Sequence, residues 1–228
     1  MSGVQPQQVR QLFEQVAPHY DRLNDLLSLG LHRLWKRQMV QLLVPRPGET
    51  WLDLCCGTGD LALLLAERLR PDGGVLAIDV AEAPLQRARL RAASRPWLAI
   101  DWQLGDALEV DRPDGHFDGA VMAYGLRNLA DPGRGLRELR RLLHHEGRAA
   151  VLDFNRTTGV PAAVQRLALR RLVVPVATQL GLESEYAYLE GSIDRFPTGT
   201  EQEQLGEEVN GLRRGAWAAG DPLELAVP

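Results

Sequence analysis

The sequence predicts a single α/β domain with a mostly parallel β-sheet and helices on both of its faces. Strand and helix signals alternate from Thr50 to Phe154, and this alternation is typical of parallel strands joined by crossover helices. A glycine turn, Gly57-Thr58-Gly59, directly follows the first of these strands. The chain has 228 residues, of which 45% are hydrophobic. That length suits one such domain and is too short for two nucleotide-binding halves with a separate catalytic domain.

Short apolar runs bounded by turn residues predict the strands of this sheet. They lie at Thr50 to Cys55, Gly74 to Asp79, Ile100 to Leu104, Phe117 to Ala123 and Arg148 to Phe154. The stretches between them predict the crossover helices, near Asp60 to Leu69, Ala83 to Ala93 and Gly133 to Leu143. Together these elements predict a cofactor-binding α/β core over residues 48–154.

The residues before the core predict a helical lid. An amphipathic segment from Val9 to Leu29 comes first, and a second helical stretch runs from Leu31 to Val44. The cluster Pro45-Arg46-Pro47-Gly48 then marks the entry to the core. We therefore expect the lid to cover residues 1–47.

The residues after the core, 155–228, are expected to form a substrate cap and C-terminal strands. They contain an apolar stretch from Pro161 to Leu182, which arginines and a proline interrupt. It is too charged to span a bilayer.

The glycine turn predicts a nucleotide pocket but leaves its ligand open. Gly57 allows the sharp turn, Gly59 lets a ligand approach bare backbone, and the helix that follows presents free N–H groups. The run from Gly57 to Ala62 also satisfies G-x-G-x-x-A, the loose form of the dinucleotide fingerprint. Asp79 lies 20 residues after Gly59, where either a dinucleotide site or an S-adenosylmethionine site places a carboxylate for ribose hydroxyls.

Two further acids favour S-adenosylmethionine. Asp53 lies inside the first strand, and Asp106 follows the third strand in Gly105-Asp106-Ala107. Nearby carboxylates stabilise the cationic methionine end of this cofactor, whereas they repel a pyrophosphate. Asp106 is also placed to accept a hydrogen bond from an adenine amino group. The alternatives are structural: Asp53 accepts from loop N–H groups, and Asp79 and Asp106 are helix N-caps.

Composition excludes several classes of protein. The formal net charge is -4, so a nucleic acid is not an expected partner. The N-terminus is polar and lacks a secretory signal, and the neighbouring Cys55 and Cys56 do not form an ordinary disulfide. We therefore expect a cytoplasmic protein. Histidine, cysteine and carboxylate residues do not cluster with metal-ligand spacing, so no metal is expected.

Several motifs together resemble the quinone-biosynthesis C-methyltransferases. Phe13-x-x-Val16-Ala17-x-x-Tyr20-Asp21-x-x-Asn24 and Leu27-Ser28-x-Gly30-x-His32-x-x-Trp35-Lys36 are similar to the opening of that family. Leu52 to Asp60 is similar to its S-adenosylmethionine loop, and Tyr124-Gly125-Leu126-Arg127-Asn128-Leu129-x-Asp131 is similar to its most specific block. The resemblance covers nearly the whole chain. It implies the class I S-adenosylmethionine-dependent methyltransferase fold, which is Rossmann-like, with S-adenosyl-L-methionine as cofactor.

One further block indicates the branch of the family. Tyr188-Leu189-x-x-Ser192-Ile193-x-Arg195-Phe196-Pro197-Thr198-Gly199 resembles the phylloquinone-type members of oxygenic phototrophs. It implies a lipophilic prenylated naphthoquinol as substrate, with 2-phytyl-1,4-naphthoquinol methylated to phylloquinol as the last step of phylloquinone biosynthesis. Methylation of demethylmenaquinol or of a ubiquinone precursor is the nearest alternative. An NAD-dependent oxidoreductase and a protein that binds the cofactor without catalysis are alternatives from other classes.

The resemblance also implies two sets of site residues. The cofactor set is Tyr20, Asp53, Gly57, Thr58, Gly59, Asp79, Asp106 and Ala107, and the catalytic set is Arg127, Asn128 and Tyr20. Arg127 is expected to stabilise the substrate phenolate or to order the water that takes its proton. Arginine itself stays charged, so it is not expected to be the direct base. Asn128 is expected to donate to a quinol oxygen, and Tyr20 to cover the methionine portion of the cofactor.

Each catalytic residue has a structural alternative. Arg127 is then a surface ion-pair residue, Asn128 starts a turn before Asp131, and Tyr20 packs in the core. A peripheral membrane contact and a homodimer are left open.

Two departures from the family pattern affect these expectations. Val80-Ala81-Glu82-Ala83-Pro84-Leu85 stands where the family has a serine and a Met-Leu pair, so the ribose side of the pocket is expected to differ slightly. The tail from Gly211 to Pro222 is short of the glycine-rich hairpin of the family. The last antiparallel strand pair is therefore expected to be truncated or out of register.

Overall fold

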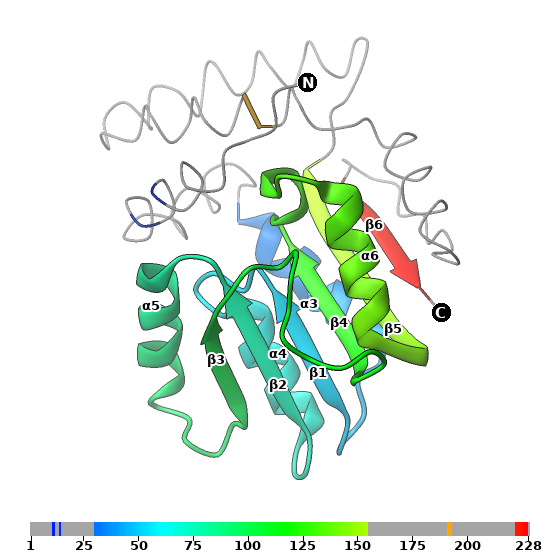
Figure 1. Cartoon of the computed structure of the whole chain (residues 1–228). Helices are drawn as coiled ribbons and strands as arrows, with labels where there is room; N and C mark the ends of the chain where they lie inside the picture. Colours follow the sequence, from blue (N-terminus) through cyan, green and yellow to red (C-terminus); the bar gives the residue numbers. More distant parts are fainter. Residues whose placement is uncertain (1–10, 12–13, 15–29, 155–190, 193–221, 228) are drawn as a thin grey trace.

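The computed structural model describes residues 30–154, 191–192 and 222–227, together with Gln11 and Glu14. In this part of the chain, six strands form one sheet in the order β3-β2-β1-β4-β5-β6 (Figure 1). The strands are β1 (Thr50–Leu54), β2 (Gly74–Asp79), β3 (Ile100–Leu104), β4 (Phe117–Ala123), β5 (Leu143–Phe154) and β6 (Pro222–Val227). Strands β1 to β5 are parallel, and β6 is antiparallel to β5. The predicted parallel α/β sheet is confirmed.

Helices cover both faces of the sheet, as predicted. They are α3 (Leu31–Leu43), α4 (Asp60–Leu69), α5 (Glu82–Ala92) and α6 (Pro132–Leu142). Leucines of α6 pack with Leu52, Leu54 and other sheet residues in one hydrophobic cluster. The second cluster joins α3, α4 and α5 to the opposite sheet face, where Trp51 is completely buried. In the described part of the chain, no helix is both long enough and apolar enough to cross a membrane.

Two strand boundaries differ from the sequence prediction. Strand β1 ends at Leu54 because Cys55 has a φ of 57°, a left-handed conformation that breaks the extended strand. Strand β5 begins at Leu143, before the predicted Arg148. Its register against β4 shifts between Leu143 and Arg148, so the added residues form an irregular part of the ladder.

The C-terminal strand pairs regularly with β5. Pro222 lies opposite Phe154 and Val227 lies opposite Ala149. The described pairing is regular, and the expected truncation or register difference relative to the family stays a prediction. The hairpin region before Pro222, most of the predicted lid with Tyr20 and Asp21, and the predicted cap up to Glu190 lie outside the described residues.

The strand order creates a site at one edge of the sheet. From β1 the chain proceeds to β2 and β3 on one side, and then returns to β4 on the other side of β1. Open parallel sheets bind ligands beyond the carboxyl ends of their strands at such a switch point. The ends of β1, β2, β3 and β4 are therefore where a cofactor pocket is expected.

Candidate active site

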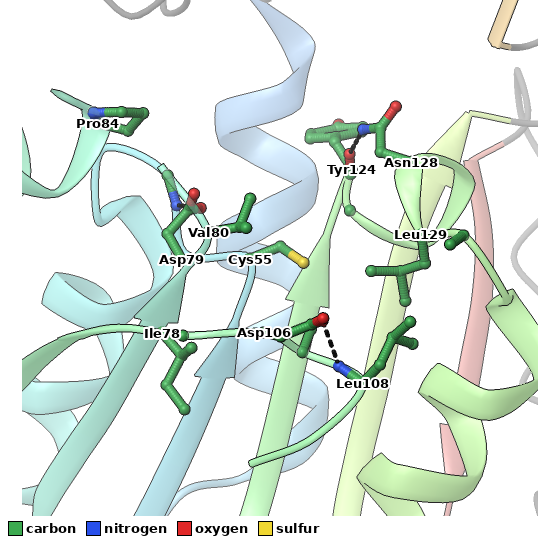
Figure 2. Close-up of a pocket in the computed structure, with 15 residues that line it drawn as sticks. Cys55, Ile78, Asp79, Val80, Pro84, Asp106, Leu108, Tyr124, Asn128 and Leu129 are labelled. Carbon is green, nitrogen blue, oxygen red and sulfur yellow. Dashed lines mark hydrogen bonds between the residues drawn. The ribbon is translucent and has the colours of Figure 1, made fainter. Parts of the chain in front are cut away.

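A pocket lies at this switch point (Figure 2). It encloses about 810 Å³ of empty space, which includes the part open to solvent. Its lining comes from the ends of four parallel strands and the loops that follow them. The lining residues are Cys55, Gly57, Ile78, Asp79, Val80, Pro84, Gly105, Asp106, Ala107, Leu108, Tyr124, Gly125, Asn128, Leu129 and Ala130. Most of these side chains are apolar, so the few polar groups stand out as candidates for binding.

The glycine loop forms one wall of the pocket. Gly57 has a φ of 54° and lines the pocket. Gly59 has a φ of 83°, and its N–H donates to Cys56 O at 2.9 Å. A Cβ added to Gly59 would lie 2.5 Å from the Trp102 ring. Thus Gly59 is needed for the turn and for packing against Trp102, and the approach of a ligand to its backbone stays a prediction.

Asp79 fixes the glycine loop to the end of β2. One carboxylate oxygen accepts from Gly57 N–H at 2.8 Å, and the other accepts from Ala81 N–H at 3.0 Å. Burial raises the pKa of Asp79, although these backbone bonds oppose the increase. Each carboxylate oxygen has a second lone pair, so Asp79 can also accept from the two hydroxyls of a ribose. Ala81, not Asp79, is the N-cap of α5, which argues against the N-cap alternative.

Asp106 lies at the exposed rim of the pocket, and Ala107 beside it is buried. Asp106 Oδ1 accepts from Leu108 N–H at 2.9 Å (Figure 2). Its other carboxylate oxygen, Oδ2, accepts no hydrogen bond from the described residues. This oxygen is therefore an acceptor beside the apolar lining of the pocket. That combination suits the amino group and face of an adenine ring.

Asp53 is buried behind the glycine loop, with 1% of its surface exposed. Its Oδ2 accepts from Ala62 N–H in the first turn of α4 at 2.9 Å, a helix N–H and not the loop N–H groups of the structural alternative. Its Oδ1 has no hydrogen-bond partner among the described residues. Burial raises the pKa of Asp53 to about 8, although the Lys36 ammonium opposes this rise. The carboxyl therefore retains an acceptor for a further donor.

This raised pKa predicts an unusual dependence of stability on pH. Asp53 titrates near 3.8 in a model peptide and at about 8 in the folded protein. Between these values the folded state binds the additional proton, so the free energy of unfolding is expected to fall as pH rises, by at most about 1.4 kcal/mol per pH unit. Urea unfolding at pH 6 and pH 8 measures this slope. Asp53→Asn should make the slope less negative, whereas Asp111→Asn, at an exposed site, should not; equal slopes in all three proteins would contradict the prediction.

A charged network surrounds a second, smaller cavity behind the loop, which Asp53 and Thr58 line. Lys36 Nζ of α3 lies 2.8 Å from one oxygen of Asp60, and Arg91 of α5 lies 2.6 Å from the other. Burial opposes ionisation, but the two cations lower the pKa of Asp60 well below its usual range. Arg91 also donates to the carbonyl and hydroxyl oxygens of Thr58. Thr58 therefore faces this network and does not line the larger pocket.

The block after β4 forms the opposite wall. Tyr124 has a φ of 60°, and its carbonyl accepts from Arg127 Nη1 and from Asn128 Nδ2, both at 3.0 Å. A Cβ on Gly125 would lie 2.6 Å from Cys55 Cβ, so a glycine allows the ends of β4 and β1 to approach. Leu126–Asn128 form a short 3-10 helix that the sequence did not predict. Asn128 lines the pocket (Figure 2).

Arg127 lies outside the lining of either cavity. Its guanidinium bonds to the Asp153 carboxylate at the end of β5, and its backbone N–H donates to the same carboxylate at 3.0 Å. Both side chains are almost completely buried. The ion pair is present, but it is buried and does not lie at the surface as the structural alternative had it, and the catalytic role of Arg127 stays a prediction.

Some residues of the pocket were not predicted. Cys55, Val80, Pro84 and Tyr124 line it, and the sulfur of Cys55 points into it (Figure 2). Burial and then the Asp79 carboxylate raise the pKa of the Cys55 thiol, so this thiol is protonated at neutral pH. Tyr124 had a signal in the sequence, because it adjoins the Gly-Leu-Arg-Asn block. In the described residues, no group of three or more histidine, cysteine or acidic side chains is placed to hold a metal ion.

The donor set fits S-adenosyl-L-methionine. Asp79 suits the ribose, Asp106 and Ala107 suit the adenine, and the buried Oδ1 of Asp53 suits an ammonium donor. Asp106 lies at the exposed rim of the pocket, and Asp53 lies on the buried side of the glycine loop.

The comparisons with known proteins agree with this fit. Residues 1–216 match the model of the ubiE/COQ5 methyltransferase family. A 2-phytyl-1,4-naphtoquinone methyltransferase of Trichormus variabilis is 45% identical over 204 residues, which are 89% of each chain. The enzyme of that name from Thermosynechococcus vestitus is 49% identical over 83% of this chain and 84% of its own. A chloroplastic 2-phytyl-1,4-beta-naphthoquinone methyltransferase of Arabidopsis thaliana is 42% identical over 88% of this chain and 78% of its own.

Solved structures show the same fold. A SAM-dependent methyltransferase from Aquifex aeolicus has a TM-score of 0.62 and 18% identity, and the match covers 98% of this chain and 97% of that one. An arsenic(III) S-adenosylmethionine methyltransferase from Chlamydomonas reinhardtii has a TM-score of 0.56 and 20% identity, over 75% and 54% of the two chains. The class I methyltransferase fold is confirmed, and with it S-adenosyl-L-methionine as cofactor. The match over almost the whole chain shows that this protein belongs to the ubiE/COQ5 methyltransferase family.

Proposed function

We propose that this enzyme methylates a ring carbon of 2-phytyl-1,4-naphthoquinol. The observation that carries the proposal is the similarity to 2-phytyl-1,4-naphtoquinone methyltransferases, at 42–49% identity over most of the chain. The largely apolar pocket supports it, because a naphthoquinol ring is flat and apolar. Demethylmenaquinol carries the same ring with another prenyl tail and is the second candidate.

The reaction needs a nucleophilic ring carbon. A quinol carbon beside a hydroxyl becomes nucleophilic when that hydroxyl loses its proton, so the protein must stabilise a phenolate and direct the proton to an acceptor. S-adenosyl-L-methionine, when bound, supplies a methyl group on a sulfonium. As the carbon–methyl bond forms, the bond between this methyl group and the sulfonium sulfur breaks, and the sulfur keeps the electron pair in the leaving S-adenosylhomocysteine. The ring carbon then loses its hydrogen as a proton, which restores the aromatic quinol.

The described residues suggest a division of roles. Asn128 lines the pocket, and its Nδ2 donates to Tyr124 O. An amide nitrogen carries two N–H groups, so this bond is compatible with the predicted donation to a quinol oxygen, which we retain as a proposal. The Arg127 guanidinium donates to the same Tyr124 carbonyl and also to the Asp153 carboxylate. We propose that Arg127 orders the wall and stabilises the phenolate through its positive charge, and that Tyr20 of the predicted lid covers the methionine portion of the cofactor.

One incubation tests the substrate. Methyl-labelled S-adenosyl-L-methionine is supplied with 2-phytyl-1,4-naphthoquinol, demethylmenaquinol or a demethylated benzoquinol, each in its chemically reduced and its oxidised form, and the products are measured by mass. We expect methylation of the naphthoquinols and none of the oxidised quinones. If only the benzoquinol gains a methyl group, the proposed substrate class is wrong.

We also propose that the enzyme meets its lipid substrate at a membrane surface. Helix α3 exposes Leu31, Leu34 and Leu42 beside Arg33 and Arg37, a combination that suits an anionic lipid surface. Supplying the quinol in anionic vesicles instead of neutral ones should therefore raise turnover in the same assay. Equal turnover in both would contradict the contact. Sedimentation equilibrium tests whether the chain forms a homodimer.

A further inference from the structure

The only lysine of the chain is buried beside the glycine loop. Lys36 stands alone among 26 lysine and arginine residues, and 8% of its surface is exposed. A lysine ammonium is a compact point charge with three donors, whereas a guanidinium is a broad planar fork. In a chain that otherwise uses arginine, this position therefore suits a cation that fits a narrow space and serves more than one acceptor.

Among the described residues, the Lys36 ammonium makes one hydrogen bond. Its Nζ donates to Asp60 Oδ2 at 2.8 Å, which leaves two of its three N–H groups. Nζ also lies 5.6 Å from the centroid of the Tyr124 ring, and Tyr124 lines the larger pocket. Lys36 is thus held between the start of α4 and the wall after β4, and it retains donors for a ligand.

Lys36 and Asp53 line the smaller cavity behind the glycine loop. This cavity has about 290 Å³ of empty space, which includes the part open to solvent. It shares the lining residues Cys55 and Gly57 with the larger pocket, so the two cavities meet at the start of the loop. A ligand whose nucleoside fills the larger pocket would therefore reach the smaller cavity past Gly57.

The charges around the smaller cavity favour a ligand that carries both signs of charge. Lys36 and Arg91 both contact Asp60, so one carboxylate stands against two cations. Burial raises the pKa of Asp53 to about 8, so this carboxyl is mostly protonated at neutral pH and adds little negative charge. The excess positive charge favours an anion, and the buried Oδ1 of Asp53, which has no partner among the described residues, can accept from an ammonium.

We propose that Lys36 binds the carboxylate of the amino-acid end of S-adenosyl-L-methionine, while Asp53 accepts from its ammonium. The smaller cavity then recognises the zwitterion at this end of the cofactor, and the larger pocket recognises the nucleoside. The inference concerns the cofactor alone, so it does not depend on which quinol is methylated.

Ligands that lack the charged groups test this assignment by titration calorimetry. Decarboxylated S-adenosylhomocysteine keeps the ammonium and lacks the carboxylate, and methylthioadenosine lacks both. We expect the wild type to bind S-adenosylhomocysteine about tenfold more tightly than the decarboxylated ligand, because hydrogen bonds between charged groups contribute strongly. Lys36→Met should remove this preference. It should lose about tenfold in affinity for S-adenosylhomocysteine and little for the decarboxylated ligand.

Methylthioadenosine reports whether the nucleoside pocket is intact, and Lys36→Met should bind it as the wild type does. Arg37→Met is the matched control, because Arg37 follows Lys36 in α3 but is exposed. It should keep the wild-type preference for the carboxylate. An equal loss of affinity for all three ligands in Lys36→Met would show that Lys36 only shapes the loop and would overturn the proposal.

The wild-type protein gives a second readout that does not depend on a folded variant. Lysine labelled with ¹⁵N at Nζ yields a single ammonium signal, because Lys36 is the only lysine. S-adenosylhomocysteine should shift this signal and slow the exchange of its hydrogens with water. The decarboxylated ligand should shift it much less and leave the exchange fast. The same shift and the same exchange rate with both ligands would contradict binding of the carboxylate by Lys36.

Discussion

Arg127→Ala is expected to lower the free energy of unfolding by about 3–5 kcal/mol. The side chains of Arg127 and Asp153 are 3% and 1% exposed. Removing the guanidinium leaves a buried carboxylate without the cation that it contacts, and the Tyr124 carbonyl also loses a donor. For a chain of this size, such a loss lowers the melting temperature by roughly 10 °C.

Urea unfolding of single and double variants identifies the source of this loss. Arg127→Ala combined with Asp153→Asn should be more stable than Arg127→Ala alone, because the neutral amide is easier to bury. Arg137→Ala is the matched control. Its partner Asp131 lies 3.8 Å away, and both side chains are more than half exposed, so it should change stability by at most about 1 kcal/mol. A similar small change in Arg127→Ala would show that the buried pair is not stabilising.

Activity measurements then separate the structural role of Arg127 from its proposed role in catalysis. If its charge stabilises the phenolate, turnover per folded molecule of Arg127→Ala should fall roughly 100- to 1000-fold, while the affinity for S-adenosylhomocysteine stays nearly unchanged. These assays are made well below the melting temperature of the variant. If turnover falls only in proportion to the folded fraction, Arg127 acts through the fold alone.

The core strands could be predicted from the sequence because local patterns determine them. Gly74–Asp79, Ile100–Leu104 and Phe117–Ala123 lie where their apolar runs placed them. The first part of β5, Leu143 to Gly147, could not be predicted as a strand from a local apolar pattern. This part of β5 contains two histidines and a glutamate, and His144 is held by Asp118 of the neighbouring β4 at 3.1 Å. A contact between strands, and not a local pattern, determines its conformation.

Part of the candidate site could also be predicted from local patterns, and part of it depends on contacts between distant residues. The carboxyl ends of parallel strands meet at one edge, which brings Gly57, Asp79, Asp106 and Asn128 to one pocket. The direction of a side chain depends on partners that the local sequence does not show. Arg127 turns toward Asp153, 26 residues later in the chain.

Asp79→Asn is expected to weaken S-adenosylhomocysteine binding by about 100-fold or more. In the wild type, the two carboxylate oxygens hold Gly57 N–H and Ala81 N–H. An asparagine has one oxygen and one NH₂ group, and its NH₂ group would face one of these donors. Hydrogen bonds to charged groups contribute about 1.5–3 kcal/mol each, and a loss of about 2.7 kcal/mol is 100-fold in affinity. Titration calorimetry measures the change.

Stability should respond differently from affinity. Burial raises the pKa of Asp79, which means that burying this charge is unfavourable, so the neutral asparagine should change the free energy of unfolding by no more than about 1–2 kcal/mol. Asp106→Asn is the matched control, because Asp106 is exposed and one of its oxygens accepts from Leu108 N–H. Asp106→Asn should weaken S-adenosylhomocysteine binding by a factor that is about tenfold smaller than the factor for Asp79→Asn. Equal losses in the two variants would mean that Asp79 contributes only a ligand contact and does not shape the glycine loop that receives the cofactor.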